Sequence, residues 1–287
     1  MKDVSQNNEW DLLIKPKRKW LDLNIKELIK YKDLLLLFVR KDIVTIYKQT
    51  ILGPIWFIVQ PLLSTLVFMF VFGNVAKLSP AGLPQDLFYL SGVVCWGLFA
   101  TSFTQNATTF ITNMSIFGKV YFPRIIIPLS KVTASFVNFG IQFLLFLLFL
   151  SYHLLTGTTV EVSQTGFLLP LYMLILSGFG LGVGLIFSSL TTKYRDFKFT
   201  IEYGTQLLMY LTPVILPLTK VPPKMQLIFK ANPVTHVIEA FRFSFIGEKA
   251  GTFSVYGLGY AAGMTLVILF IGFIMFNKTE QNFIDTV

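Results

Sequence analysis

The sequence predicts an all-α, polytopic membrane protein with six transmembrane helices. Of its 287 residues, 54% are apolar and only 14% are charged, against about 25% charged in an ordinary soluble domain. Six stretches are nearly free of charge, and each is close to or above the roughly 20 residues that cross a bilayer's hydrocarbon core. The net charge of +9 is concentrated between alternate stretches, which indicates membrane topology rather than nucleic-acid binding. These observations exclude a secreted domain, a soluble enzyme and a disordered regulator.

Residues 1–50 are predicted to form a cytoplasmic segment before a six-span transmembrane domain, residues 51–287. The segment holds 11 of the 24 Lys and Arg residues, and its start lacks the apolar core of a signal peptide. Asn24 and Glu27 have capping-box spacing, and apolar residues recur beyond them at helical intervals. We expect a basic amphipathic helix that lies on the anionic leaflet of the membrane. A helix packed on a soluble partner is the alternative.

The six predicted spans define the topology. They are residues 52–76, 87–111, 132–155, 166–192, 203–218 and 253–277. Because six is even, both ends of the chain share one side of the membrane. The segments on that side carry 18 Lys and Arg residues and those on the other side carry 6. The positive-inside rule therefore predicts that both termini are cytoplasmic.

The fifth predicted span, residues 203–218, is short and contains two prolines. The segment that follows, residues 219–252, contains three more prolines and five basic residues, and its Glu239 and Arg242 share one helical face. We expect a broken helix and then short re-entrant or periplasmic helices between spans five and six. Irregular backbone at membrane depth is tolerated only where it is buried in protein or lines a water-filled cavity. A kinked span followed by an exposed loop is the alternative.

Small residues predict close helix packing in two spans. In the fourth span, Gly178, Gly180, Gly182 and Gly184 form two overlapping four-residue spacings. In the sixth span, Gly259 and Gly263 form another. Such spacings let two helix backbones approach each other. They leave open whether the neighbouring helix belongs to the same chain.

The predicted spans contain no Lys, Arg, Asp or Glu. Charges at membrane depth mark ion pathways and catalysis, so a secondary transporter and a membrane-embedded enzyme are disfavoured. His153 and His236 have no His or Cys neighbour at metal-ligand spacing. The chain also lacks a phosphate-binding loop, because Gly118-Lys119 is followed by Val120. If this protein moves something uphill, another polypeptide supplies the energy.

Four blocks of residues follow one another in a recognisable order and spacing, and the similarity extends from about Leu23 to Asp285. They are Arg40-Lys41-Asp42, Tyr47-Lys48-Gln49-Thr50, Leu52-Gly53-Pro54, Trp56 and Gln60-Pro61; then Phe122-Pro123-Arg124 and Pro128-Leu129-Ser130; then Tyr194-Arg195-Asp196; then Tyr210-Leu211-Thr212-Pro213-Val214 and Asn232-Pro233. Together they resemble the membrane subunits of type 2 ABC exporters, in the branch that exports polysaccharides.

The resemblance implies a homodimer of this permease with two copies of a separate ATP-binding subunit, in a bacterial inner membrane. ATP and Mg would be bound by that subunit, with no cofactor in this chain. The implied substrate is a lipid-linked glycan, with lipopolysaccharide O-antigen as the leading candidate. Teichoic acid, capsule, or a drug or simple lipid are the alternatives. The resemblance also places Arg40, Lys41, Asp42 and Tyr47 in an interface helix at the entry to the first span.

The resemblance further implies that residues 115–123 form a coupling helix that docks on the ATP-binding subunit. Its candidate residues are Phe117, Gly118, Lys119, Tyr121 and Phe122, and the next cytoplasmic turn adds Arg195 and Asp196. The alternative is an aromatic belt at the membrane interface with positive-inside charge.

A channel for the glycan is expected along the first and fifth spans, which the resemblance places at the dimer axis. Each unpaired sugar hydroxyl would cost roughly 2–7 kcal/mol in hydrocarbon, so a polymer needs a polar or aromatic path. The candidate lining residues are Trp56, Phe57, Gln60, Phe68, Tyr203 and Tyr210. Any single ring among them has an alternative position against lipid or in the core.

Overall fold

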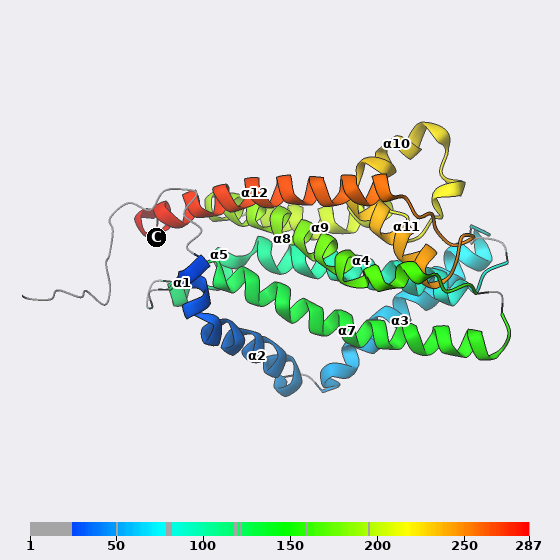
Figure 1. Ribbon diagram of the computed structural model, residues 1–287. Coiled ribbons are helices and arrows are strands. Elements are labelled where there is room, and N and C mark those ends of the chain that lie inside the picture. Colours follow the sequence, from blue (N-terminus) through cyan, green and yellow to red (C-terminus); the bar gives the residue numbers. More distant parts are fainter. Residues whose placement is uncertain are drawn as a thin grey trace, which may run out of the picture.

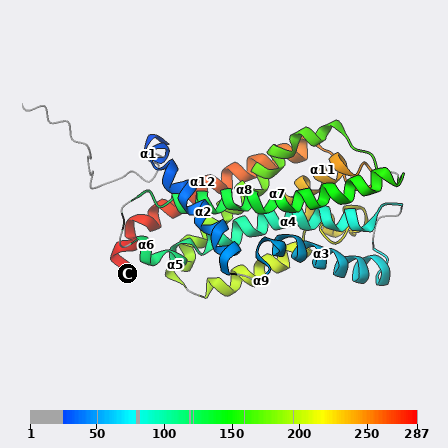
Figure 2. The ribbon, with the colours of Figure 1, turned by 90° about the horizontal axis from the view of Figure 1, so that it is seen from below.

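The computed structural model describes residues 25–49, 51–78, 82–117, 120, 122–158, 160–194 and 196–286. Within these ranges all regular structure is helical, which confirms the predicted all-α class. The long helices run alongside one another in one elongated bundle (Figure 1). One end of the bundle, called here the α5 end, holds α1 (Ile25–Lys30), α2 (Lys32–Gln49), α5 (Thr109–Thr112), α6 (Met114–Phe117) and the C-terminal part of α12 (Val255–Thr286) (Figures 1 and 2). Toward the other end, the α11 end, lie α10 (Pro223–Ala231) and α11 (Pro233–Phe245) (Figure 1).

In the described part of the chain, five helical stretches are long and apolar enough to cross a membrane. They are Gly53–Val75, which comprises the 3-10 helix η1 (Gly53–Ile55), α3 (Trp56–Phe68) and the π-helix η2 (Met69–Val75); Gln85–Ala107 (α4); Ile126–Leu155 (α7); Gln164–Lys193, which comprises η3 (Gln164–Leu168) and α8 (Leu169–Lys193); and Val255–Gln281, within α12 (Val255–Thr286). Five of the six predicted spans therefore correspond to these stretches, and the chain is a multi-pass membrane protein.

The remaining predicted span, residues 203–218, is not one helix of spanning length. Helix α9 (Phe197–Tyr210) has 14 residues, which corresponds to about 21 Å. The chain then turns, and residues 212–215 are buried without being helical. Pro213 and Pro217 lack the N–H that helix continuation needs, so the break that they predict is present, whereas the count of six spans is not confirmed.

Two short helices follow the break, α10 (Pro223–Ala231) and α11 (Pro233–Phe245). Asn232 caps α11, because its side-chain oxygen accepts a hydrogen bond from the Val234 N–H at 3.1 Å, and Pro233 occupies the first helical position. Most of α11 is buried against α4, α8 and α12. The alternative of an exposed loop is therefore wrong for this helix.

Helix α4 lies at the centre of the bundle. It packs against α3, α7, α8, α9 and α11, and 72% of its apolar stretch is buried inside the chain. For the stretch that contains α3 the buried share is 11%. Most of the α3 surface therefore faces away from the rest of this chain, toward lipid or another protein molecule.

The glycines of α8 let it pack closely against two neighbours. A Cβ atom at Gly184 would lie 2.7 Å from the Asn106 Cβ atom of α4, and one at Gly182 would lie 2.8 Å from the Leu269 nitrogen of α12. The predicted close approach of the fourth span is thus confirmed on two faces. Cβ atoms at Gly259 and Gly263 would meet nothing within 4 Å, so the described residues provide no partner for that spacing.

Substitution of Gly184 by alanine is expected to destabilise the protein by about 1–3 kcal/mol, because the methyl group would collide with α4. The matched control is Gly263→Ala on α12, where a Cβ atom meets open space. The apparent melting temperature of each purified protein in detergent checks the expectation. Equal melting temperatures for the two variants would contradict the packing described here.

Helices α1 (Ile25–Lys30) and α2 (Lys32–Gln49) precede the first span. Helix α2 packs against α7, and its Val39 is buried, while Leu36 and Leu37 are exposed. The predicted N-terminal helix is therefore present, with one face on the protein. Its placement on a membrane surface stays a prediction.

Candidate functional site

A polar cavity of about 190 Å³ lies between α3, α4 and α7. Its lining residues are Phe57 and Gln60 of α3; Gly97, Leu98, Thr101 and Gln105 of α4; and Ser135, Asn138, Phe139 and Gln142 of α7. Within each helix these positions recur at intervals of three or four residues, with the neighbours Gly97-Leu98 and Asn138-Phe139 among them, which places them on one helix face. Three membrane-crossing helices thus bring polar groups together at one place. Among the described lining residues none is charged.

Two of the six predicted channel residues, Phe57 and Gln60, line this cavity. The ring of Phe68 lies 6.3 Å from that of Tyr89 and is partly buried. Trp56, Tyr203 and Tyr210 are exposed on the outer surfaces of α3 and α9, by 43%, 68% and 49%. The structure of one chain therefore brings part of the predicted set together. A role in a channel stays a prediction for all six residues.

The predicted coupling segment lies at the α5 end, where α5 (Thr109–Thr112) and α6 (Met114–Phe117) follow α4. Phe117 is only 6% exposed and Phe122 only 5%. The Phe117 ring lies 5.8 Å from the Phe110 ring and 6.0 Å from the Phe122 ring. Both side chains therefore point into the protein, whereas Met114 and Val120 are exposed.

Arg124 joins this aromatic cluster to the C-terminal helix. Its guanidinium carbon lies 5.3 Å from the centre of the Phe117 ring, and Nη1 donates a hydrogen bond to the Glu280 carbonyl of α12 at 2.9 Å. Burial lowers the pKa of Arg124, and the Glu280 charge opposes this change. The connection between α4 and α7 is thereby tied to the end of α12.

The other predicted coupling residues are placed only in part. Gly118, Lys119, Tyr121 and Arg195 lie outside the described residues. Asp196 is exposed at the start of α9. The coupling role of this set stays a prediction.

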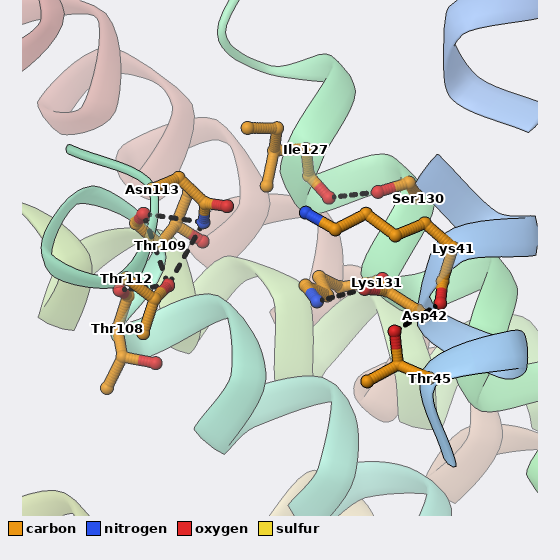
Figure 3. A network of polar contacts seen from close by, with 10 residues as sticks. All are labelled: Lys41, Asp42, Thr45, Thr108, Thr109, Thr112, Asn113, Ile127, Ser130 and Lys131. Carbon is orange, nitrogen blue, oxygen red and sulfur yellow. Dashed lines mark hydrogen bonds and ion pairs between the residues drawn. The ribbon is translucent and has the colours of Figure 1, made fainter. Parts of the chain in front are cut away.

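Helix α2 is tied to α7 by an ion pair. The Lys131 Nζ atom donates to the Asp42 Oδ1 atom at 2.8 Å, and both side chains are partly exposed (Figure 3). Arg40 and Lys41 are exposed, and the side chain of Tyr47 lies outside the described residues. Of the four predicted interface-helix residues, Asp42 is thus the one that contacts the transmembrane bundle through a described ion pair.

The Lys131–Asp42 pair is expected to contribute about 0.2–1 kcal/mol, because solvent screens a partly exposed pair. Asp42→Ala and Lys131→Ala should each lower the melting temperature slightly, and the double variant should lose no more than the larger single effect. A double-mutant cycle on the purified protein measures this coupling. Strictly additive losses would show that the pair contributes nothing.

A fully buried arginine lies at the α11 end. The Arg242 Nε atom donates to the Ser91 hydroxyl at 3.2 Å, and Nη2 donates to the carbonyls of Phe88 at 3.1 Å and Val214 at 3.0 Å. Nη1 donates to the Pro213 carbonyl. The guanidinium therefore joins α11 to the start of α4 and to the irregular segment after α9. We call this set of contacts the Arg242 clamp.

Two neighbours complete the Arg242 clamp. The guanidinium carbon lies 3.7 Å from the centre of the Phe88 ring, and Nη1 lies 3.9 Å from the Glu239 Oε1 atom. Burial lowers the pKa of Arg242 to about 10, against the opposing effect of Glu239, so the side chain is charged at neutral pH. Burial likewise raises the pKa of Glu239, and the Arg242 charge opposes that rise.

The sequence predicts that Glu239 and Arg242 share one helical face, and the structure adds that the two side chains are buried. A usable signal was present, since Val237, Ile238 and Phe241 surround the pair with apolar residues. Seven of the 13 residues of α11 are Val, Ile, Ala or Phe, and such a short, mainly apolar helix is typical of a buried helix.

Residues 33–246 match the family described as ABC-2 type transporter. The chain belongs to the ABC-2 type transporter family. The matched range contains both the polar cavity and the Arg242 clamp. The resemblance to type 2 ABC exporters is therefore confirmed, and this multi-pass chain is an ABC-2 permease.

Several proteins named for polysaccharide export or transport are similar to this chain over most of their length. The O-antigen export system permease protein RfbA of Klebsiella pneumoniae is 30% identical over 88% of this chain and 94% of that protein. The protein of the same name from Myxococcus xanthus is 24% identical over 92% and 98%. The polysialic acid transport protein KpsM of Escherichia coli is 24% identical over 85% and 92%.

Proposed function

We propose that this chain is the transmembrane subunit of an ATP-driven ABC transporter that exports a lipid-linked polysaccharide across a bacterial inner membrane. The leading candidate for that polysaccharide is lipopolysaccharide O-antigen. The observation that carries the proposal is the similarity to a permease named for O-antigen export, which extends over 88% of this chain and 94% of that relative. Capsule-type polymers and teichoic acid are the alternative glycans, and a drug or simple lipid is the alternative outside polysaccharides. The relative named for polysialic acid transport favours a polysaccharide over a drug.

We infer that the functional transporter contains a homodimer of this chain and two copies of a separate ATP-binding subunit. The sequence has no phosphate-binding loop, so ATP and Mg are assigned to that subunit. The exposed apolar surfaces of α3 and α9 support contact with a second copy. Both termini are assigned to the cytoplasm. Helix α9 with the buried segment after it is assigned as the fifth of six crossings, between α8 and α12.

Coupling to the ATP-binding subunit is assigned to the α5 end. The predicted coupling segment, residues 115–123, belongs to this end, where Met114 and Val120 are exposed. The buried rings of Phe117 and Phe122 then act as the support of that segment rather than as the contact itself. Motion of the segment would reach α12 through the hydrogen bond from Arg124 to the Glu280 carbonyl.

The proposed function is tested by removing the gene from its host and restoring it on a plasmid. The surface polysaccharide should disappear, lipid-linked glycan should accumulate on the cytoplasmic side, and the restored gene should reverse both effects. Immunolabelling of intact and of permeabilised cells separates the two pools. Loss of the O-antigen alone identifies the substrate, whereas an unchanged surface polysaccharide of every kind would refute the proposal.

A further inference from the structure

Four carboxamide side chains converge on the cavity between α3, α4 and α7: Gln60, Gln105, Asn138 and Gln142. Within the part of the chain that the structure describes, none of the four makes a hydrogen bond to another residue. The hydroxyl of Thr101 beside them is likewise unpaired among these residues. By contrast, Ser135 is engaged, because it donates to the Val132 carbonyl at 2.7 Å.

This arrangement is unusual for membrane-crossing helices. Asn and Gln side chains in such helices ordinarily form hydrogen bonds across the helix contact. A polar group without a partner costs several kcal/mol in hydrocarbon, and each carboxamide carries two N–H donors and one carbonyl acceptor. Four unpaired carboxamides on three facing helices therefore indicate that their partners come from outside the chain.

The lining selects the chemical class of that partner. The described lining residues carry no charge, so an ion would receive no counter-charge here. An acyl chain would leave the carboxamides unpaired. A sugar hydroxyl donates and accepts hydrogen bonds, as a carboxamide does, and the apolar side chains of Phe57, Leu98 and Phe139 offer surfaces for sugar C–H groups.

The cavity has room for a group much larger than one water molecule. Its volume of about 190 Å³ far exceeds the roughly 10–15 Å³ of accessible space that one water molecule needs. Gly97 and Gln105 are eight residues apart on α4, which corresponds to about 12 Å along the helix. The missing side chain of Gly97 also makes room, since a Cβ atom there would lie 3.2 Å from the Gln142 Oε1 atom.

We propose that the carboxamides of Gln60, Gln105, Asn138 and Gln142 form a binding site for one neutral sugar unit of the exported glycan. The site deepens the proposed function and rests on it. Asn138 and Gln142 lie in the middle of the 30-residue helix α7, and Gln105 lies near the end of α4 at the α5 end. The carboxamides therefore extend from the α5 end into the bundle, which suits stepwise entry of a polymer.

The test uses the complex of this chain with its ATP-binding subunit, and lipid-linked glycan purified from the host as the probe. The double variant Gln105→Leu/Gln142→Leu removes two carboxamides at similar volume, and Asn138→Leu is a second, milder variant. Gln164→Leu is the matched control, because Gln164 is exposed at the start of η3 and lies outside the cavity. The measured quantities are the melting temperature and the glycan concentration that gives half-maximal stimulation of ATP hydrolysis.

The double variant should need at least about tenfold more glycan, which corresponds to the loss of two ordinary hydrogen bonds. Its melting temperature should equal or exceed that of the unmodified protein, because the lost groups have no partner in the chain. Unchanged glycan dependence would overturn the sugar site, and so would a lower melting temperature in both variants, since the carboxamides would then serve the fold. If glycan fails to stimulate the unmodified complex, the proposed function fails instead.

Discussion

Replacing Arg242 by alanine is expected to prevent accumulation of folded protein. The substitution leaves the carbonyls of Phe88, Pro213 and Val214 without their donor, and it leaves Glu239 buried without the neighbouring positive charge. Breaking a buried ionic contact of this kind costs about 3–5 kcal/mol, which is comparable with the whole stability of many domains. Yield after detergent extraction and the melting temperature of the purified protein measure the effect.

Two companion variants test whether the protein needs the guanidinium contacts of the Arg242 clamp or only a positive charge. Arg242→Lys should also be impaired, because an ammonium group lacks the planar fork that reaches several carbonyls at once. Lys249→Ala should behave like the unmodified protein, since Lys249 is exposed on the segment after α11. Normal yield and melting temperature in Arg242→Ala would show that the clamp does not hold the α11 end together.

Replacing Phe117 by alanine is expected to destabilise the α5 end by about 3–5 kcal/mol, the usual cost of removing a buried phenylalanine. The Phe117 ring packs between Phe110 and Phe122 and under the guanidinium of Arg124. Its loss therefore leaves a cavity where the connection between α4 and α7 is held. The melting temperature of the purified protein reports the change.

Val120→Ala provides the matched control, because Val120 is 59% exposed in the same segment. It should leave the melting temperature unchanged and weaken co-purification of the ATP-binding subunit, if this surface makes the contact. The opposite result, a stable Phe117→Ala protein that no longer binds the subunit, would mean that Phe117 itself is the docking residue.

Much of the fold could be predicted because bilayer thickness fixes the length of apolar stretches. The starts and ends of α4, α8 and the membrane-crossing part of α12 lie within a few residues of the predictions. Helix α7 extends further, to Ile126, since its first turns are buried in protein and need no purely apolar sequence. The break after α9 was predictable from Pro213 and Pro217, because proline removes a backbone donor.

The site was less predictable, because its features depend on which helix faces meet. Thr101 and Gln105, and likewise Asn138 and Gln142, show the spacing of one helix face in the sequence. Nothing in the sequence says that these two faces oppose each other. The inward position of Phe117 and the carbonyl partners of Arg242 are tertiary contacts across many residues, and local pattern does not encode them.

In the proposed function, this chain moves a lipid-linked polysaccharide while a separate ATP-binding subunit supplies the energy. The most direct test of this transport places the purified complex in vesicles that carry the host glycan on the outer leaflet, with the ATP-binding subunit facing outward. After ATP is added, glycan should become protected from an added glycosidase, and vesicles that contain this chain alone should show no protection. Protection without ATP or without the subunit, or none with the complete complex and ATP, would contradict the account.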